Sequence, residues 1–147
     1  MRKRAFALAL AFALLVPVVS RAGADSDALL QFGLIGHWAF DCQKPPSPAN
    51  PFINFNFTGS GQPTRQIITG KPEIDSRVPL SNVTILDALH LRLSYPQGGV
   101  TVTVTLLMEL GRVRPYEAIA SDGTVSVSGG NVTATGQPTN WLLKCPD

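Results

Sequence analysis

Two cysteines, Cys42 and Cys145, are the reactive residues whose spacing carries the most information about this chain. Each follows a tryptophan by four residues, Trp38 and Trp141 respectively, and the chain contains no other cysteine. Side chains alternate between the two faces of a β-strand, so each ring would share a face with its neighbouring sulfur. The chemistry that this predicts is a disulfide joining the first strand of the fold to the last, with free thiols or metal ligands as the alternatives.

The other chemically capable side chains form no recognisable catalytic or metal-binding pattern. His37 and Asp41 would lie about 13 Å apart on one strand, too far for acid–base coupling. His90 has no evident partner, and Ser60 lies in Thr-Gly-Ser-Gly, which indicates a hairpin loop and not the strand-to-helix turn of a hydrolase nucleophile. The sequence therefore predicts a non-enzymatic protein with no cofactor, no catalytic residue and no metal site.

The N-terminus has the pattern of a secretory signal peptide. Arg2-Lys3-Arg4 precedes an apolar run over 5–19, and small residues follow at 22–24. The run is shorter than the ~20 residues that a transmembrane helix needs, although a retained membrane anchor is the alternative. We therefore expect residues 1–24 to be a signal peptide and residues 25–147 to be a single β-barrel domain, in the periplasm or secreted.

Removal of the signal peptide would reverse the sign of the net charge. The whole chain of 147 residues has a formal charge of +2, but residues 1–24 contain four basic and no acidic residues. The mature domain would carry eight basic and ten acidic residues, a net charge of −2. Because no cluster of Lys or Arg remains, we expect no nucleic-acid binding. Once the signal peptide is cleaved, we also expect no membrane association.

Short apolar alternations separated by turn residues predict an all-β domain. The alternation is clearest over 34–42, 53–57, 89–95 and 100–110, and Gly98-Gly99 between the last two predicts a tight hairpin. Further strands are expected over 64–69, 81–86, 111–116, 125–127, 132–134 and from Trp141 onward, with an edge or a bulge at Pro115. About eight strands with consecutive tight turns favour an antiparallel up-and-down barrel, because the paired cysteines would make the first and last strands neighbours.

Two segments outside the strands also have a predictable form. Residues 25–33 combine capping residues, adjacent leucines and a terminal glycine, which is typical of one or two helical turns that plug or flank the sheet. Four prolines between Pro45 and Pro51 predict an exposed and stiff loop.

The opening of the predicted domain resembles a known barrel family. The segment Leu34-Ile35-Gly36-His37-Trp38, after a short helical turn, is similar to the Gly-x-Trp opening strand of lipocalins and related calycin barrels. This resemblance implies that Gly36 lets the chain pass tightly at the closed end of a barrel, where Trp38 packs. The pattern Leu-x-Gly-x-Trp-x-x-Asp-Cys, with a proline-rich loop and a terminal Trp before Cys-Pro, also resembles small secreted bacterial proteins of uncharacterised function. That second resemblance implies a location in the bacterial envelope and no particular activity.

The sequence supports two functions from different classes. The first is a non-enzymatic barrel that binds a small apolar ligand or a partner protein of the envelope. Its interior would be lined or filled by six aromatic residues, Trp38, Phe40, Phe55, Phe57, Tyr95 and Trp141. The second is an inhibitor of an extracytoplasmic protease or lysozyme, whose contact surface would be the loop over 45–51 with Lys44, or the Asp122-Gly123 turn.

Overall fold

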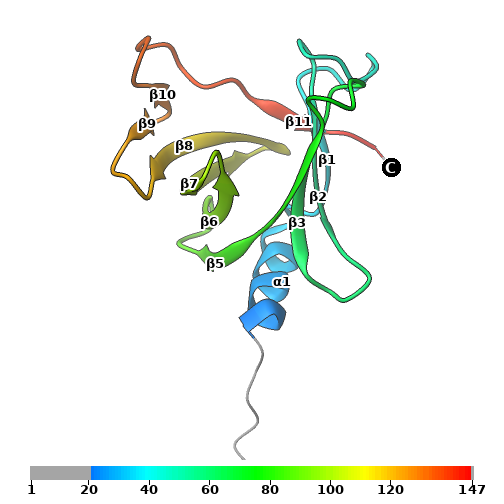
Figure 1. Cartoon of the computed structure of the whole chain (residues 1–147), viewed down its shortest axis with the longest axis vertical. Coiled ribbons are helices and arrows are strands. Elements are labelled where there is room, and N and C mark those ends of the chain that lie inside the picture. The colour runs from blue at the N-terminus through cyan, green and yellow to red at the C-terminus, as the bar shows by residue number, and fades with distance from the viewer. Residues whose placement is uncertain (1–20, 147) are drawn as a thin grey trace, which may run out of the picture.

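Antiparallel strands joined by tight turns wind the chain into a nearly closed barrel with a helix at one end (Figure 1). The structure is a computed structural model that describes residues 21–146. The apolar run of the predicted signal peptide lies outside these residues. The helix found within them is neither long nor apolar enough to cross a membrane.

Helix α1 spans Arg21–Phe32 and is longer than the one or two turns expected over 25–33. It ends where Gly33 adopts a φ of +79°, a left-handed conformation that glycine tolerates. The amide of Gly33 donates to the carbonyl of Leu30, and the amide of Leu34 donates to that of Leu29, the paired pattern of a Schellman cap. Leu29 and Phe32 are buried, so the helix packs into one end of the barrel.

Eleven strands make up the sheet in the described part of the chain. In chain order they are β1 (Gly36–Ala39), β2 (Phe52–Phe57), β3 (Pro63–Ile68), β4 (Ser76–Pro79), β5 (Ser81–Ile85), β6 (His90–Gln97), β7 (Val100–Glu109), β8 (Arg112–Ala120), β9 (Val125–Ser128), β10 (Asn131–Val132) and β11 (Leu142–Lys144). Nine of them follow the order β4-β3-β2-β1-β11-β8-β7-β6-β5, while β9 and β10 form a hairpin beside β8. This confirms the all-β, up-and-down architecture. None of the expected strand segments covers β4, whose Ser-Arg-Val-Pro sequence has no apolar alternation.

The first and last strands are neighbours, as the cysteine spacing predicted. β11 pairs with β1 along one edge, where Trp38 lies opposite Lys144 and Ala39 opposite Leu143. Along its other edge β11 pairs with β8, where Leu142 lies opposite Val113. The three-residue strand β11 therefore joins the β1–β4 half of the barrel to the β5–β8 half.

The remaining seam lies between β4 and β5, the two ends of the strand order. Leu80 is the one residue between these strands; it is fully buried, and its amide donates to the carbonyl of Pro63. Helix α1 packs against β5 and β3 beside this seam (Figure 1). A bulge in β5 turns the amide of Val83 away from the sheet, and the buried carboxylate of Asp25 accepts its hydrogen bond at 2.8 Å.

Two local features that the sequence indicated are present. Gln97 and Val100 pair across a two-residue turn at Gly98-Gly99, where both φ angles are positive, as the tight hairpins of twisted sheets require. The register of β7 and β8 shifts between Thr105 and Leu106, opposite the Pro115 region, which confirms the expected bulge. Among the described residues no strand pairs with the outer edge of β8 at Pro115, since β11 pairs before it and β9 after it; the Pro115 carbonyl instead accepts a hydrogen bond from the Thr139 hydroxyl.

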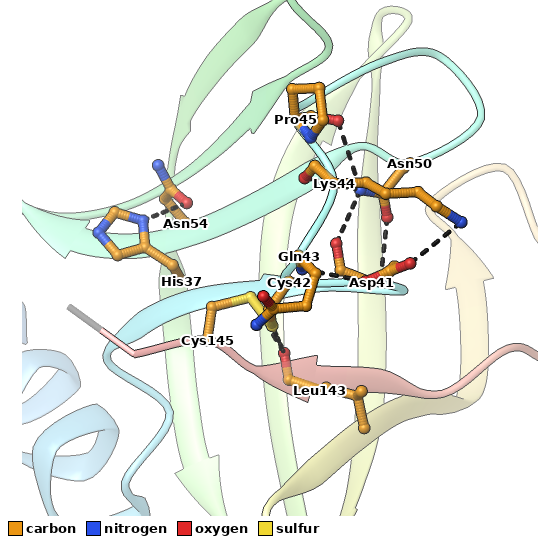
Figure 2. The surroundings of a disulfide bond; sticks show 10 residues. All are labelled: His37, Asp41, Cys42, Gln43, Lys44, Pro45, Asn50, Asn54, Leu143 and Cys145. Atoms are coloured by element: carbon orange, nitrogen blue, oxygen red, sulfur yellow. Dashed lines mark hydrogen bonds and ion pairs between the residues drawn. A yellow bond between two sulfur atoms is a disulfide. The ribbon is translucent and has the colours of Figure 1, made fainter.

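The disulfide Cys42–Cys145 links the segment after β1 to the residue after β11, beside the pairing of these two strands (Figure 2). Its Cα atoms are 5.4 Å apart, and the amide of Cys145 donates to the carbonyl of His37 next to the bridge. The two cysteines are 103 residues apart in sequence. In the chain-entropy account, a crosslink over about 100 residues stabilises a fold by about 4.7 kcal/mol.

We therefore expect the double substitution Cys42→Ala with Cys145→Ala to lower the free energy of unfolding by about 4 to 5 kcal/mol. The reason is that β11 is only three residues long and the unlinked chain regains the freedom of a long loop. Urea denaturation followed by tryptophan fluorescence measures the change. Equal urea midpoints for the oxidised protein and the double variant would show that the bridge does not hold the fold together.

Candidate functional site: the barrel cavity

The barrel encloses a cavity of about 270 Å³ that is lined mainly by apolar side chains. Strands from both halves contribute to the lining, including Ile53, Phe55, Leu93, Tyr95, Val102 and Val104. This volume lies just below the range of about 300–1,000 Å³ that small-molecule sites occupy, so it suits a small ligand. The cavity is therefore large enough to hold a small molecule.

Along β6 the cavity is lined by Leu93, Tyr95 and Gln97, so it lies toward the Gly98-Gly99 end of the barrel. Burial of the β6 side chains falls in the same direction. The positions of β6 that alternate inward are Leu91, Leu93, Tyr95 and Gln97. The first two are at most 1% exposed, Tyr95 is half-buried and Gln97 is exposed. The opposite end is filled by α1 and by core side chains such as Leu29 and Trp38.

Arg65 is the cationic side chain that the sheet register directs into this cavity. It lies directly opposite Phe55, so the two side chains project from the same face of the sheet. The guanidinium carbon lies 4.7 Å from the centre of the Tyr95 ring, a cation–π contact. Burial lowers the pKa of Arg65 below its ordinary value, and the neighbouring Tyr95 raises it, but a guanidinium stays charged at neutral pH.

Four of the six aromatic residues predicted to occupy the interior pack in or against the core. Phe55 and Tyr95 line the cavity itself. Trp38 is 1% exposed and packs in the filled part of the core, where its indole N–H donates to the carbonyl of Leu34 at 2.8 Å. Phe57 packs against the core without lining the cavity. The interior is therefore filled at the helix end and hollow at the other.

The other two predicted aromatics lie outside the interior, which corrects the sequence-based placement. Phe40 is 38% exposed, because β1 ends at Ala39 and the alternation expected over 34–42 stops there. Trp141 precedes β11, and its ring contacts the guanidinium groups of Arg112 and Arg114 at 4.4 and 4.6 Å. Neither residue lines the cavity.

The two histidines lie on the outer face of the sheet, each with a partner that the sequence did not reveal. His37 forms a hydrogen bond with the side chain of Asn54 at 2.7 Å, across the β1–β2 pair (Figure 2). His90 lies 3.0 Å from the carboxylate of Asp87 and stacks edge-on against Tyr116. Within residues 21–146 no three side chains of the metal-ligating types come together.

Sequence reasoning missed Arg65, although a signal was present. Pro63, Arg65 and Ile67 share one face of β3, and the other two are apolar, so alternation alone places Arg65 with inward-facing residues. The sequence did not predict that Arg65 lies opposite Phe55, because this depends on the register of the β2–β3 hairpin.

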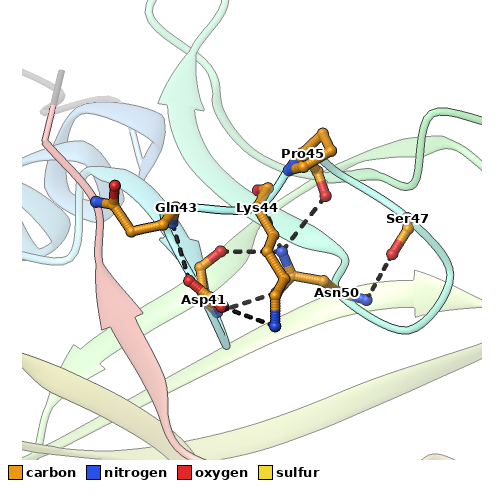
Figure 3. Close-up of polar contacts among 6 residues, drawn as sticks. All are labelled: Asp41, Gln43, Lys44, Pro45, Ser47 and Asn50. Carbon is orange, nitrogen blue, oxygen red and sulfur yellow. Dashed lines mark hydrogen bonds and ion pairs between the residues drawn. The ribbon is translucent and has the colours of Figure 1, made fainter.

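The proline-rich loop, the second candidate surface, is held in one conformation by Asn50 (Figure 3). The Asn50 side chain is 7% exposed; its oxygen accepts from the amide of Asp41, and its amide group donates to the carbonyl of Asp41, both at 3.0 Å. The backbones of Ser47 and Asn50 exchange two further hydrogen bonds. The loop is therefore stiffened by a buried amide as well as by its prolines.

The fold and the cavity define a β-barrel of the kind that can enclose a small molecule. Comparisons of the chain with protein-family models, with curated proteins and with solved structures found no match. The resemblance to calycin barrels therefore rests on the Gly-x-Trp strand and on the nearly closed antiparallel barrel.

Acid should weaken the contacts of Asp41 at the base of this loop. The amide of Gln43 donates to the Asp41 carboxylate and Lys44 forms an ion pair with it at 3.1 Å, so the pKa of Asp41 lies below its ordinary value of 3.8. A lowered folded-state pKa means that the contribution to stability is present above about pH 4 and is lost as pH falls through the folded value. We expect an NMR titration of the Asp41 carboxyl to give a midpoint below 3.8.

The variant Lys44→Met should retain most of this pKa depression, because the backbone hydrogen bond from Gln43 is its largest cause. An Asp41 midpoint at or above 3.8 in the unmodified protein would contradict this loop geometry.

Proposed function

We propose that this protein is a non-enzymatic binding protein that holds a small, largely apolar molecule inside its barrel. The observation that carries the proposal is the cavity of about 270 Å³ between the two halves of the sheet. Core packing in proteins normally leaves few voids larger than a water molecule, so a lined space of this size needs an occupant or a reason to stay empty.

Its placement within the barrel supports the proposal. The helix end of the core is closed by α1, while the inward-facing residues of β6 become exposed toward the other end. An apolar interior with a few polar groups near its entrance is the usual composition of small-molecule sites. Ligand entry at the Gly98-Gly99 end would require no opening of the sheet.

We also propose that the protein works in an oxidising compartment, secreted or in the bacterial periplasm. The disulfide supports this location, because such bridges persist outside the reducing cytosol. The signal-peptide pattern at the N-terminus and the resemblance to small envelope proteins agree with it.

A neutral apolar dye tests the binding proposal through a cavity-filling variant. Val102 lines the cavity, while Thr101 is exposed on the opposite face of the same strand. We expect 1-N-phenylnaphthylamine to gain fluorescence with the unmodified protein, and Val102→Phe to weaken its binding about tenfold or more, equivalent to about 1.4 kcal/mol. Thr101→Phe is the matched control and should bind the dye normally.

Circular dichroism of each variant shows whether the barrel is retained. The proposal fails if the unmodified protein gives no fluorescence gain. It also fails if folded Val102→Phe binds the dye as tightly as the control variant does.

A second candidate function, inhibition of an extracytoplasmic hydrolase, is favoured by the stiff loop around Asn50. A surface loop that is already ordered binds a partner at lower entropic cost. Hydrogen bonds of the Asn50 side chain and backbone amide hold this loop, and the charged side chain of Lys44 is exposed beside it.

If the loop is an inhibitory surface, the protein at micromolar concentration should slow at least one enzyme in a panel of lysozymes and secreted proteases. Asn50→Ala should then weaken inhibition about tenfold, because the loop must be ordered on binding. Full activity of every enzyme in the panel would remove this candidate.

A further inference from the structure

Arg65 has an unusual environment for a cation inside a barrel. Its neighbours in the sheet are Phe55 on β2 and Val78 on β4, both apolar. A guanidinium carries five N–H donors and no acceptor. Within the described part of the chain, its partner is the face of the Tyr95 ring, and no carboxylate forms an ion pair with it.

The cavity lining contains arginine but no acidic residue. A second arginine, Arg114, also lines the cavity; its guanidinium lies against the Trp141 ring at 4.6 Å, outside the lining, and its Nε is buried without a hydrogen-bond partner among the described residues. Arg65 is the arginine of this lining whose ring contact, Tyr95, also lines the cavity. Arg65 is half-buried, and a partly buried charge without a counterion still loses hydration, so proteins normally pair such groups.

We propose that Arg65 binds the carboxylate of an amphipathic ligand whose apolar body fills the rest of the cavity, an inference that rests on the binding function proposed above. A carboxylate accepts two parallel hydrogen bonds from one guanidinium, which is a geometry that a single ammonium group does not offer. Tyr95 holds one face of the guanidinium, so its edge donors remain for the ligand. Ile53, Leu93 and Val104 provide apolar walls for the ligand body.

The ligand class follows from the charge and the size of the space. A volume of about 270 Å³ suits a single short chain or ring system better than a long lipid. We therefore expect a medium-chain or aromatic monocarboxylate to bind more tightly than a neutral molecule of the same shape, and a cationic one to bind least well.

Three probes of equal chain length test this inference, namely decanoate, decanol and decyltrimethylammonium, each below its micellar concentration. Displacement of the neutral dye 1-N-phenylnaphthylamine measures their affinities. With the unmodified protein, decanoate should displace the dye at a concentration about tenfold lower than decanol does.

Within the Arg65→Met variant, decanoate and decanol should displace the dye at similar concentrations, because the group that favours the carboxylate is lost. Arg65→Lys should keep part of the preference, because a point charge remains but the paired donors are lost. Arg92→Met is the matched control: Arg92 is exposed on the outer face of β6, and its loss should not change the preference for decanoate. If Arg65→Met does not fold, Arg65→Lys supplies the comparison.

The outcomes separate this inference from the proposed function. Equal affinities for decanoate and decanol in the unmodified protein, or an unchanged preference in folded Arg65 variants, would overturn the role of Arg65 while apolar binding stands. Absence of dye and decanol binding, by contrast, would overturn the binding function itself, and the role of Arg65 with it.

Discussion

The pairing of β1 with β11 is the interaction on which the rest of this structure depends. β11 is hydrogen-bonded to β1 on one edge and to β8 on the other, and it is the strand through which the two halves of the sheet join. Elsewhere the halves are connected by the chain itself at Leu80 and by the packing of α1. A strand of three residues makes few hydrogen bonds, so the neighbouring disulfide adds the restraint that the short strand lacks.

The cavity follows from this closure. One end of the barrel receives α1 and Trp38, which fill the space between the halves. Among residues 21–146 no helix lies at the other end; there β9 pairs with the last part of β8 and β10 pairs with β9. The side chains there leave a space bordered by Phe55, Tyr95 and Arg65. The same arrangement that closes the sheet therefore also creates an interior into which Arg65 projects without an ion-pair partner among residues 21–146.

Much of the fold could be predicted from the sequence, because period-two alternation and turn residues are local signals. The Gly98-Gly99 hairpin, the bulge at Pro115 and the pairing of the cysteine-bearing ends all follow from residues near each other or from the even cysteine count. Strand β4 was not predicted because its residues show no apolar alternation. It is a strand because its backbone pairs with β3.

The site was harder to predict, because it depends on register and on strand ends. Phe40 does not face the interior because β1 ends one residue before it. Trp141 precedes β11, and its ring contacts Arg112 and Arg114. Arg65 faces inward because it lies opposite Phe55, and this pairing is set by the register of the β2–β3 hairpin, which the alternation of β3 alone does not give. Local pattern thus predicts the barrel, while tertiary pairing decides what the barrel contains.

Closure of the barrel by its two ends is tested most directly by a cross-strand nuclear Overhauser effect in the oxidised protein. Trp38 and Lys144 lie opposite each other next to the hydrogen bond from Cys145 to His37, so they form the closely spaced, non-hydrogen-bonded type of pair. We expect a strong cross-peak between their Hα protons and a slowly exchanging Cys145 amide. Absence of that cross-peak, in a spectrum where the β6–β7 hairpin shows its own cross-strand peaks, would contradict the pairing of β1 with β11.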